Sequence, residues 1–365
     1  MITKFDEIQQ IIEQINPVKY SSDRNFIDGS VSKLSPYISR GFISTKYIYN
    51  ILISKGFQFN QIEKFTQEMI WREFWQKKWQ THDIDKDIKH KQENVFRYGI
   101  PEVVSKKKTK IKIIDKCIGE LYDSGYMHNH MRMYVASYIT NIGGYHWKLP
   151  AKWMYYYLLD ADWGSNALSW QWICGTNSNK KYYANQDNIN KFTKTHQKNT
   201  ILDKSYEKLS KYKSYDEFKK IIKFDLNTNL PDSDVFLNLD NKPICIYNFY
   251  NIDPTWRRDI DANRILLIEP SVFKKHPISE NSMNFMLSLS KNIPNIKVIV
   301  SEFKDLPIKK SKVYYKEHPF NSNYIGIMDQ RDWLVSDVYH QSFFKYWKLV
   351  KKSLTKKKLI SFLIR

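Results

Sequence analysis

Residues 124–175 are the most informative stretch of the chain and read SGYMHNHMRMYVASYITNIGGYHWKLPAKWMYYYLLDADWGSNALSWQWICG. On an α-helix, one face would carry the side chains spaced i, i+3, i+4 and i+7, namely Asn129, Arg132, Met133 and Ala136. An amide, a guanidinium and a thioether on one face are unusual for a core stripe. They form a reasonable wall for a polar aromatic ligand, so the stretch predicts a helical binding site.

Two carboxylates in the same stretch, Asp160 and Asp162, follow directly after the apolar run from Trp153 to Leu159. An unpaired buried charge is costly, so both carboxylates need partners. Arg132 is the natural partner of Asp160, through a charge-assisted bond. A purely structural ion pair is the alternative, and this pair of residues alone favours it.

A second helical face lies in residues 68–75, which read EMIWREFW. Its side chains at spacings i, i+3, i+4 and i+7 are Glu68, Trp71, Arg72 and Trp75. A carboxylate beside an indole can hold the edge of a base while the ring stacks on its plane. An amphipathic helix with a tryptophan-rich core stripe explains the same spacing, and taken alone this alternative is preferred.

Residues 28–41, which read DGSVSKLSPYISRG, combine hydroxyls, glycine and a helix start. Backbone N–H groups and hydroxyls in such an arrangement can bind a phosphate. Ser-Pro at a helix start is common in ordinary proteins, so the motif is weak by itself.

The charge balance favours a polyanionic partner. Lysine and arginine total 58 against 38 acidic residues, a formal net charge of +20. Neutralising phosphates with such side chains releases counterions and drives binding to nucleic acid. A coding bias toward lysine is the alternative reading of the same numbers.

The cysteine count and the hydropathy pattern exclude several classes of protein. Cys117, Cys174 and Cys245 are far apart and odd in number, which indicates a reducing compartment and no disulfide scaffold. Three thiols are too few for an ordinary iron–sulfur cluster, and we expect no metal site. The sequence has no run of eighteen apolar residues. We therefore expect a cytoplasmic protein that has no membrane partner.

The periodicity and composition of the sequence change along the chain. Helical periodicity dominates the first part, whereas short β-rich runs occur later at 243–250, 264–268 and 296–300, with a helix candidate at 279–292. We expect a mainly α protein with a smaller C-terminal α/β domain that contains a parallel or mixed sheet. The predicted division is a helical domain 1–200, a helix and linker 201–230, an α/β domain 231–345 and a basic amphipathic helix 346–365.

Taken together, these motifs resemble the FAD-binding domain of the photolyase–cryptochrome family. The four blocks that carry the resemblance are residues 28–44, 68–75, 126–137 and 158–172. They follow the family's order within residues 20–190, and four dispersed blocks are far more specific than any one. The resemblance implies a photolyase-type helical domain that binds FAD.

The resemblance also implies a set of cofactor-binding residues. They are Tyr20, Ser32, Leu34, Ser35, Arg72, Asn129, Arg132, Asp160, Asp162 and Asn166. Ser32, Leu34 and Ser35 match the phosphate-binding segment, and Asn166 matches the position that faces flavin N5. The family's photolyases have asparagine there, whereas plant cryptochromes have aspartate and animal ones cysteine. Asn166 therefore favours repair over signalling.

Other matched positions imply catalysis. In the family's repair enzymes, the residues contacting a cyclobutane pyrimidine dimer match Glu68, Trp71, Asn129, Met133 and Trp172. Trp170 and Trp147 match the inner two tryptophans of the chain that reduces the flavin in light. The outer tryptophan has no clear match, and Tyr98, Trp75 and Trp79 are the candidates to replace it.

The function implied by the resemblance is light-dependent repair of pyrimidine dimers in DNA, with single-stranded DNA as a candidate substrate. One alternative is a cryptochrome-like FAD photoreceptor, and another is a flavin-dependent nucleic-acid-binding protein that does not repair. Two departures bear on this choice. Val31 replaces a usual threonine, and His130 replaces a usual arginine. Family members usually begin with an α/β domain that carries an antenna chromophore, and here the α/β-like segment comes last. No particular antenna cofactor or protein partner is implied.

Overall fold

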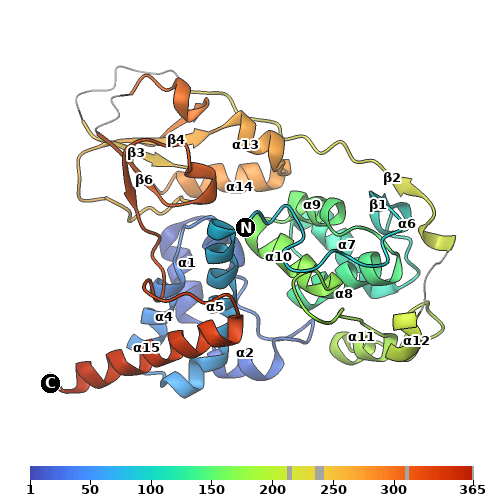
Figure 1. The fold of residues 1–365 in the computed structure, drawn as a ribbon. Coiled ribbons are helices and arrows are strands. Elements are labelled where there is room, and N and C mark those ends of the chain that lie inside the picture. Colours follow the sequence, from blue (N-terminus) through green and yellow to red (C-terminus); the bar gives the residue numbers. More distant parts are fainter. Residues whose placement is uncertain (212–215, 235–241, 309–311, 364–365) are drawn as a thin grey trace.

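A computed structural model describes residues 1–211, 216–234, 242–308 and 312–363, with side chains of the last helix described as far as Thr355. Figure 1 shows a helical part and a smaller sheet part that packs against it. This matches the predicted fold class, a mainly α chain followed by a smaller α/β unit. Within the described residues, no helix is both long and apolar enough to cross a bilayer.

The helical part contains twelve α-helices in its described residues, together with one π-helical turn that follows α8. Their bounds are α1 Phe5–Glu13, α2 Pro17–Asp23, α3 Ser35–Ser39, α4 Thr45–Ser54, α5 Phe59–Thr81, α6 Glu102–Ser105, α7 Lys112–Ser124, α8 Asn129–Ser137, η1 Tyr138–Ile142, α9 Lys148–Tyr157, α10 Trp163–Cys174, α11 Gln186–Thr193 and α12 Tyr206–Lys211.

Local sequence signals set the ends of the helices that form the site. The Asp162 side chain accepts a hydrogen bond from the Ser165 backbone N–H and caps α10. Gly175 ends α10 and Gly125 ends α7, both with positive φ, which glycine adopts without steric cost. The start and the length of α10 are therefore encoded locally.

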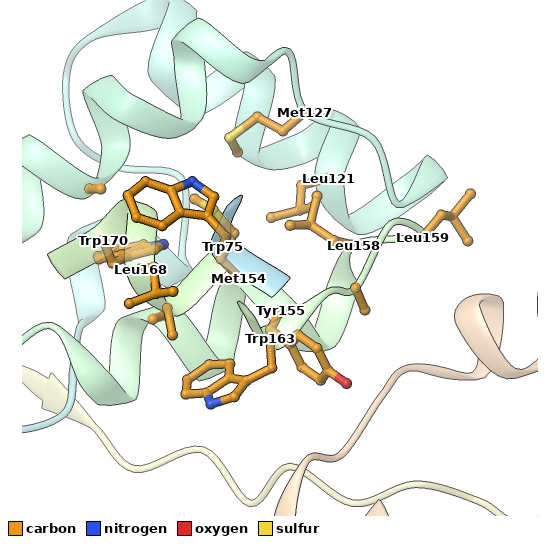
Figure 2. Packing of buried hydrophobic residues seen from close by; sticks show 14 of the residues in the cluster. Trp75, Leu121, Met127, Met154, Tyr155, Leu158, Leu159, Trp163, Leu168 and Trp170 are labelled. Carbon is orange, nitrogen blue, oxygen red and sulfur yellow. The ribbon is translucent and has the colours of Figure 1, made fainter. Parts of the chain in front are cut away.

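Large aromatic side chains fill the core of the helical part. Trp147, Trp153, Trp163 and Trp170 are all buried. Figure 2 shows Trp163 beside Tyr155, and their ring centroids are 5.7 Å apart. Helix α10 packs against α5, α8 and α9, so its residues lie at the centre of this part.

The sheet part is built on five parallel strands. These are β3 Ile244–Tyr247, β4 Asn263–Ile268, β5 Lys297–Val300, β6 Val313–Lys316 and β7 Ile327–Asp329, in the order β5-β4-β3-β6-β7. Helices α13 Pro270–Lys275 and α14 Glu280–Ser290 connect β4 to β5. The strand order reverses between β3 and β6, and open parallel sheets commonly bind ligands at the carboxyl ends of strands at such a point.

Two further elements tie the parts together. The two-residue strands β1 Ile100–Pro101 and β2 Ile221–Ile222 pair in antiparallel fashion, so the segment predicted as a helix and linker also contains a strand. The last helix, α15 Phe343–Leu363, lies against α5, away from the sheet (Figure 1).

Direct hydrogen bonds join the sheet part to the helical part. The Ile252 backbone N–H donates to the Arg40 carbonyl, and the Ser279 N–H donates to the Tyr156 carbonyl. The Trp163 N–H, at the start of α10, donates to the Tyr250 hydroxyl at 3.3 Å. The residues after β3 therefore reach the helix that carries the predicted cofactor residues.

Candidate functional site

The two carboxylates singled out in the sequence lie in one buried ion network. Arg132 on α8 pairs with Asp160 at 3.0 Å, as predicted. Arg72 on α5 pairs with Asp162 at 2.8 Å and lies 3.7 Å from Asp160. Although burial alone would raise the pKa of Asp160, the Arg132 and Arg72 guanidiniums hold it below its ordinary value. The Asp160 carboxylate thus stays charged although it is buried.

The same network reaches the predicted phosphate-binding segment. Ser35, the first residue of α3, donates a hydrogen bond to the Asp160 carboxylate. Ser32 accepts a long bond from the Leu34 N–H at 3.5 Å, and Leu34 itself is buried. Asp160 therefore links α3, α5 and α8, three segments that are far apart in sequence.

Tyr20 lies on α2, which packs against α5. Its ring packs edge-on against Phe65 of α5, with centroids 4.9 Å apart. Burial raises the pKa of its phenol, and the nearby Glu68 carboxylate raises it further. Tyr20 is therefore a neutral hydroxyl at any physiological pH, suited to hydrogen bonding.

The first turn of α10 carries polar groups that remain available. The Asn166 amide nitrogen donates to the Ala151 carbonyl at 2.7 Å, so its oxygen is the atom that can meet a ligand. Within the described residues, the buried Ser165 hydroxyl has no partner. A buried hydroxyl without a partner is costly and is commonly satisfied by a ligand or water. The two guanidiniums, the free amide oxygen and this hydroxyl fit FAD, which offers phosphates, hydroxyls and ring acceptors.

The predicted dimer-contacting residues lie on α5, α8 and α10. Glu68 pairs with Lys64 at 2.9 Å and with Arg24 at 3.5 Å. Asn129 begins α8 and is exposed, and Met133, one turn further, is half-buried. Helix α10 packs against both α5 and α8.

The two predicted indoles of this set have other aromatic neighbours. Trp172 on α10 is 37% exposed and packs on Tyr182, with centroids 5.8 Å apart. Trp71 on α5 is stacked by Phe343 of α15, a contact that no sequence motif indicated. The Trp172 ring is thus open to solvent, whereas one face of the Trp71 ring is covered by Phe343.

The predicted electron-transfer residues Trp147 and Trp170 are both buried. Trp147 stacks on Trp163 at 6.3 Å and on His146 at 5.8 Å between ring centroids. His146 in turn stacks at 5.5 Å on Tyr98, which is 67% exposed. Sequence reasoning missed Trp163 and His146, although Trp163 directly follows Asp162.

Trp75 and Trp79, the other two candidates for the outer position, have packing neighbours of their own. Trp75 lies against Trp71, with centroids 5.1 Å apart, and Trp79 lies against Phe320 at 5.0 Å. Both are almost fully buried. Of the three candidates, Tyr98 is the one that connects Trp147 to solvent.

A polar cavity of about 90 Å³ lies where the sheet part meets α5. It is lined by Arg72 and Asp162 from the helical part and by residues that follow β3 and β6, including Asn251 and His318. It is far smaller than the few hundred cubic ångströms that ligands of drug size occupy, so the cavity alone does not hold a dinucleotide.

Sequence reasoning missed Gln76 and Arg331, which line the same cavity beside the ion network. Gln76 donates to the Asp162 carboxylate and accepts a hydrogen bond from Arg331 at 2.6 Å. Neither residue belongs to a recognised motif, because the contact joins segments 255 residues apart.

Comparison with known proteins finds similarity in the helical part of the chain. Residues 65–212 match a family described as the FAD-binding domain of DNA photolyase. The deoxyribodipyrimidine photo-lyase of Alkalihalophilus pseudofirmus is 29% identical over 174 residues, which cover 45% of this chain and 36% of that protein. That of Agrobacterium fabrum is 30% identical over 171 residues, which cover 43% and 34%. The chain thus spans about a third of the length of these relatives.

Two other proteins are similar over part of their length. The cryptochrome DASH of Vibrio parahaemolyticus is 27% identical over 203 residues, which cover 49% of this chain and 42% of that protein. A bacterial class III photolyase structure from Agrobacterium tumefaciens is 28% identical and has a TM-score of 0.38, with 47% of this chain and 37% of that chain covered. Together with the family match, these relatives show that residues 65–212 of the chain are similar to the FAD-binding domain of DNA photolyase.

Proposed function

We propose that this protein repairs cyclobutane pyrimidine dimers in DNA in a light-dependent reaction. The observation that carries the proposal is the junction at which Arg72, Arg132, Asp160 and Ser35 meet, because it joins the motifs implied to hold the cofactor. The relatives named as deoxyribodipyrimidine photo-lyases support the same reaction class. When bound, reduced FAD supplies the light-driven electron that opens the cyclobutane ring.

The protein's own residues orient the reactants. Arg72, Arg132, Asp160 and Asp162 would hold the cofactor in one pose, because each guanidinium is already fixed by a buried carboxylate. Tyr20, Ser32, Leu34 and Ser35 would bind its phosphate region. Pre-organised partners of this kind lose little freedom on binding.

Asn166 supports repair over light sensing. Its amide nitrogen is held by the Ala151 carbonyl, so the oxygen is left to accept a hydrogen bond from the flavin edge. An amide oxygen accepts a bond but delivers no proton. This suits a cofactor that must return to the same reduced form after each turnover.

The dimer would be held by Glu68, Trp71, Asn129, Met133 and Trp172. A damaged pair must leave the duplex to reach these residues, and extrusion is easiest for a poorly stacked or single-stranded site. The net charge of +20 favours the approach of DNA of either form. We therefore include single-stranded DNA among the proposed substrates.

The test is to illuminate the chemically reduced, FAD-loaded protein with dimer-containing oligonucleotides and to follow the return of thymine absorbance. We expect light-dependent return with single strands at least as fast as with duplexes. Glu68→Gln should slow repair about tenfold through loss of one charged hydrogen bond. Glu207→Gln, a change in an exposed carboxylate of α12, is the matched control. The absence of any return in both DNA forms rules out the repair function.

A further inference from the structure

The C-terminal helix covers one of the proposed dimer-binding residues. Phe343, the first residue of α15, lies flat on the Trp71 indole with ring centroids 3.3 Å apart and planes 7° from parallel. Phe343 itself is 5% exposed. This is the face-to-face geometry in which nucleic-acid bases stack on aromatic side chains. Phe343 therefore covers one face of the Trp71 indole.

The later turns of α15 are held by contacts that do not involve Trp71. Tyr346 is fully buried and lies against Phe74, with centroids 5.7 Å apart. Lys351 forms an ion pair with Glu63 of α5 at 2.7 Å. Release of the first turn would consequently leave the rest of the helix docked on α5.

The chain before α15 is anchored at a different point. Lys77 of α5 donates to the carbonyls of Val335, Ser336 and Val338, each at 3.1 Å. The bonds described for residues 339–342 are local, such as the Ser342 N–H to the His340 ring at 2.9 Å. A short, mostly exposed segment thus joins two anchored regions, and the first turn of any helix has backbone N–H groups without intrahelical partners. Phe343 is the first residue of α15 after this segment, and its ring also lies edge-on to Phe74, with centroids 5.6 Å apart.

We infer that Phe343 holds the place of a base on Trp71, so that DNA must displace it in order to bind. The inference rests on the proposed function and extends it, because it makes the first turn of α15 a competitor of the substrate. Exposed lysines of the same helix, Lys345, Lys348 and Lys352, attract phosphates to this side of the protein. The competing ligand that best fits a stacked indole beside exposed lysines is a single-stranded or extruded nucleotide.

The full-length protein with Phe343→Leu tests this competition. Leucine keeps an apolar side chain against α5 but has no flat ring to stack on Trp71. Its affinity for a dimer-containing single strand should rise about three- to tenfold, the value of one aromatic stack. Phe344→Leu is the matched control, because its neighbouring ring is 72% exposed and meets Trp71 edge-on. We expect this control to leave the affinity unchanged.

Fluorine NMR of protein labelled with fluorotryptophan reports on the stack without FAD or light. The Trp71 signal is identified as the one lost in Trp71→Phe. It should move in Phe343→Leu, and excess dimer-containing DNA should move it in the wild type. A signal that does not move in Phe343→Leu overturns the inference, because the stack is then not populated.

A Trp71 signal that moves in Phe343→Leu while the affinity for DNA stays unchanged also overturns the inference, because DNA then does not compete for this face.

The repair function and the role of Phe343 fail in different ways. Tighter binding by Phe343→Leu without repair by any variant refutes the repair function alone. Repair by the wild type with equal affinities refutes only the role of Phe343.

Discussion

The helical part and the sheet part meet at the same cavity, yet they carry very different sequence information. The family match ends at residue 212, and the motifs that indicate FAD all lie before that point. The sheet nevertheless supplies Asn251 and His318 to the cavity, and the segment after it supplies Arg331, which holds Gln76 against Asp162. A recognisable cofactor motif can thus depend on a neighbour that carries no motif of its own.

The largest effect should come from breaking the ion network in the helical part. Asp160→Ala leaves Arg132 without its buried partner and removes one of the two carboxylates near Arg72. The expected loss of folding free energy is about 3–5 kcal/mol. We expect loss of FAD and a lower free energy of unfolding. Flavin absorbance of the purified protein and urea unfolding are the measurements, with the exposed Asp123→Ala as the control. Yellow Asp160→Ala protein would contradict the assignment.

The pH dependence of stability tests the boundary between the two parts. Burial raises the pKa of Glu73, on α5 at the cavity, to about 7 from an ordinary value of 4.5. Between these values the folded state binds a proton that the unfolded state has lost. The free energy that Glu73 contributes to folding is therefore fully present below about pH 4.5 and is lost as pH rises through about 7.

Glu73→Gln removes this titration and keeps the acceptor that the Leu334 N–H uses. The stability difference between the variant and the wild type should grow with pH by up to about 3 kcal/mol. Urea unfolding of both proteins at about pH 4 and at about pH 8, below and above the window from 4.5 to 7, measures it, and other titrating groups cancel in the comparison. A difference that is constant with pH would show that Glu73 titrates normally.

Breaking the hydrogen bond that Arg331, from the segment after the sheet, donates to Gln76 should have a smaller effect. Arg331→Met leaves the Gln76 oxygen without its donor and frees Gln76 to turn from Asp162, at a cost of about 2 kcal/mol. We expect weaker FAD retention without complete loss. Urea unfolding and the flavin-to-protein ratio check this, with the exposed Arg258→Met as control. Unchanged retention would mean that the helical part holds the cofactor unaided.

The smallest effect on repair should come from the aromatic row that ends at Tyr98. Trp147→Phe interrupts the stack between Trp163 and His146, so photoreduction of the oxidised protein should slow severalfold. Trp170→Phe should act in the same direction. Protein reduced chemically beforehand should repair at the wild-type rate. If photoreduction is unchanged in both variants, the electrons take another route.

Some parts of this picture could be predicted from local patterns. Helical spacing placed Asn129, Arg132 and Met133 on one helix, and the cost of burying charge led to the Arg132–Asp160 pair. The β-rich runs before residue 301 predicted three strands of the sheet, but they did not reveal β6 or β7. Strand β6 is flanked by polar residues and β7 has only three residues, so periodicity alone does not distinguish them from loops.

The sequence by itself determined the helices of the site, the buried Arg132–Asp160 pair and the similarity to an FAD-binding domain, because these follow from spacing, charge and motif order within local stretches of the chain. Only the tertiary structure decided that Arg331 supports Asp162 through Gln76 and that Phe343 lies on Trp71. Each of these contacts joins residues more than 250 positions apart. Local propensity says nothing about such pairs, since their energies arise only after packing has brought the segments together.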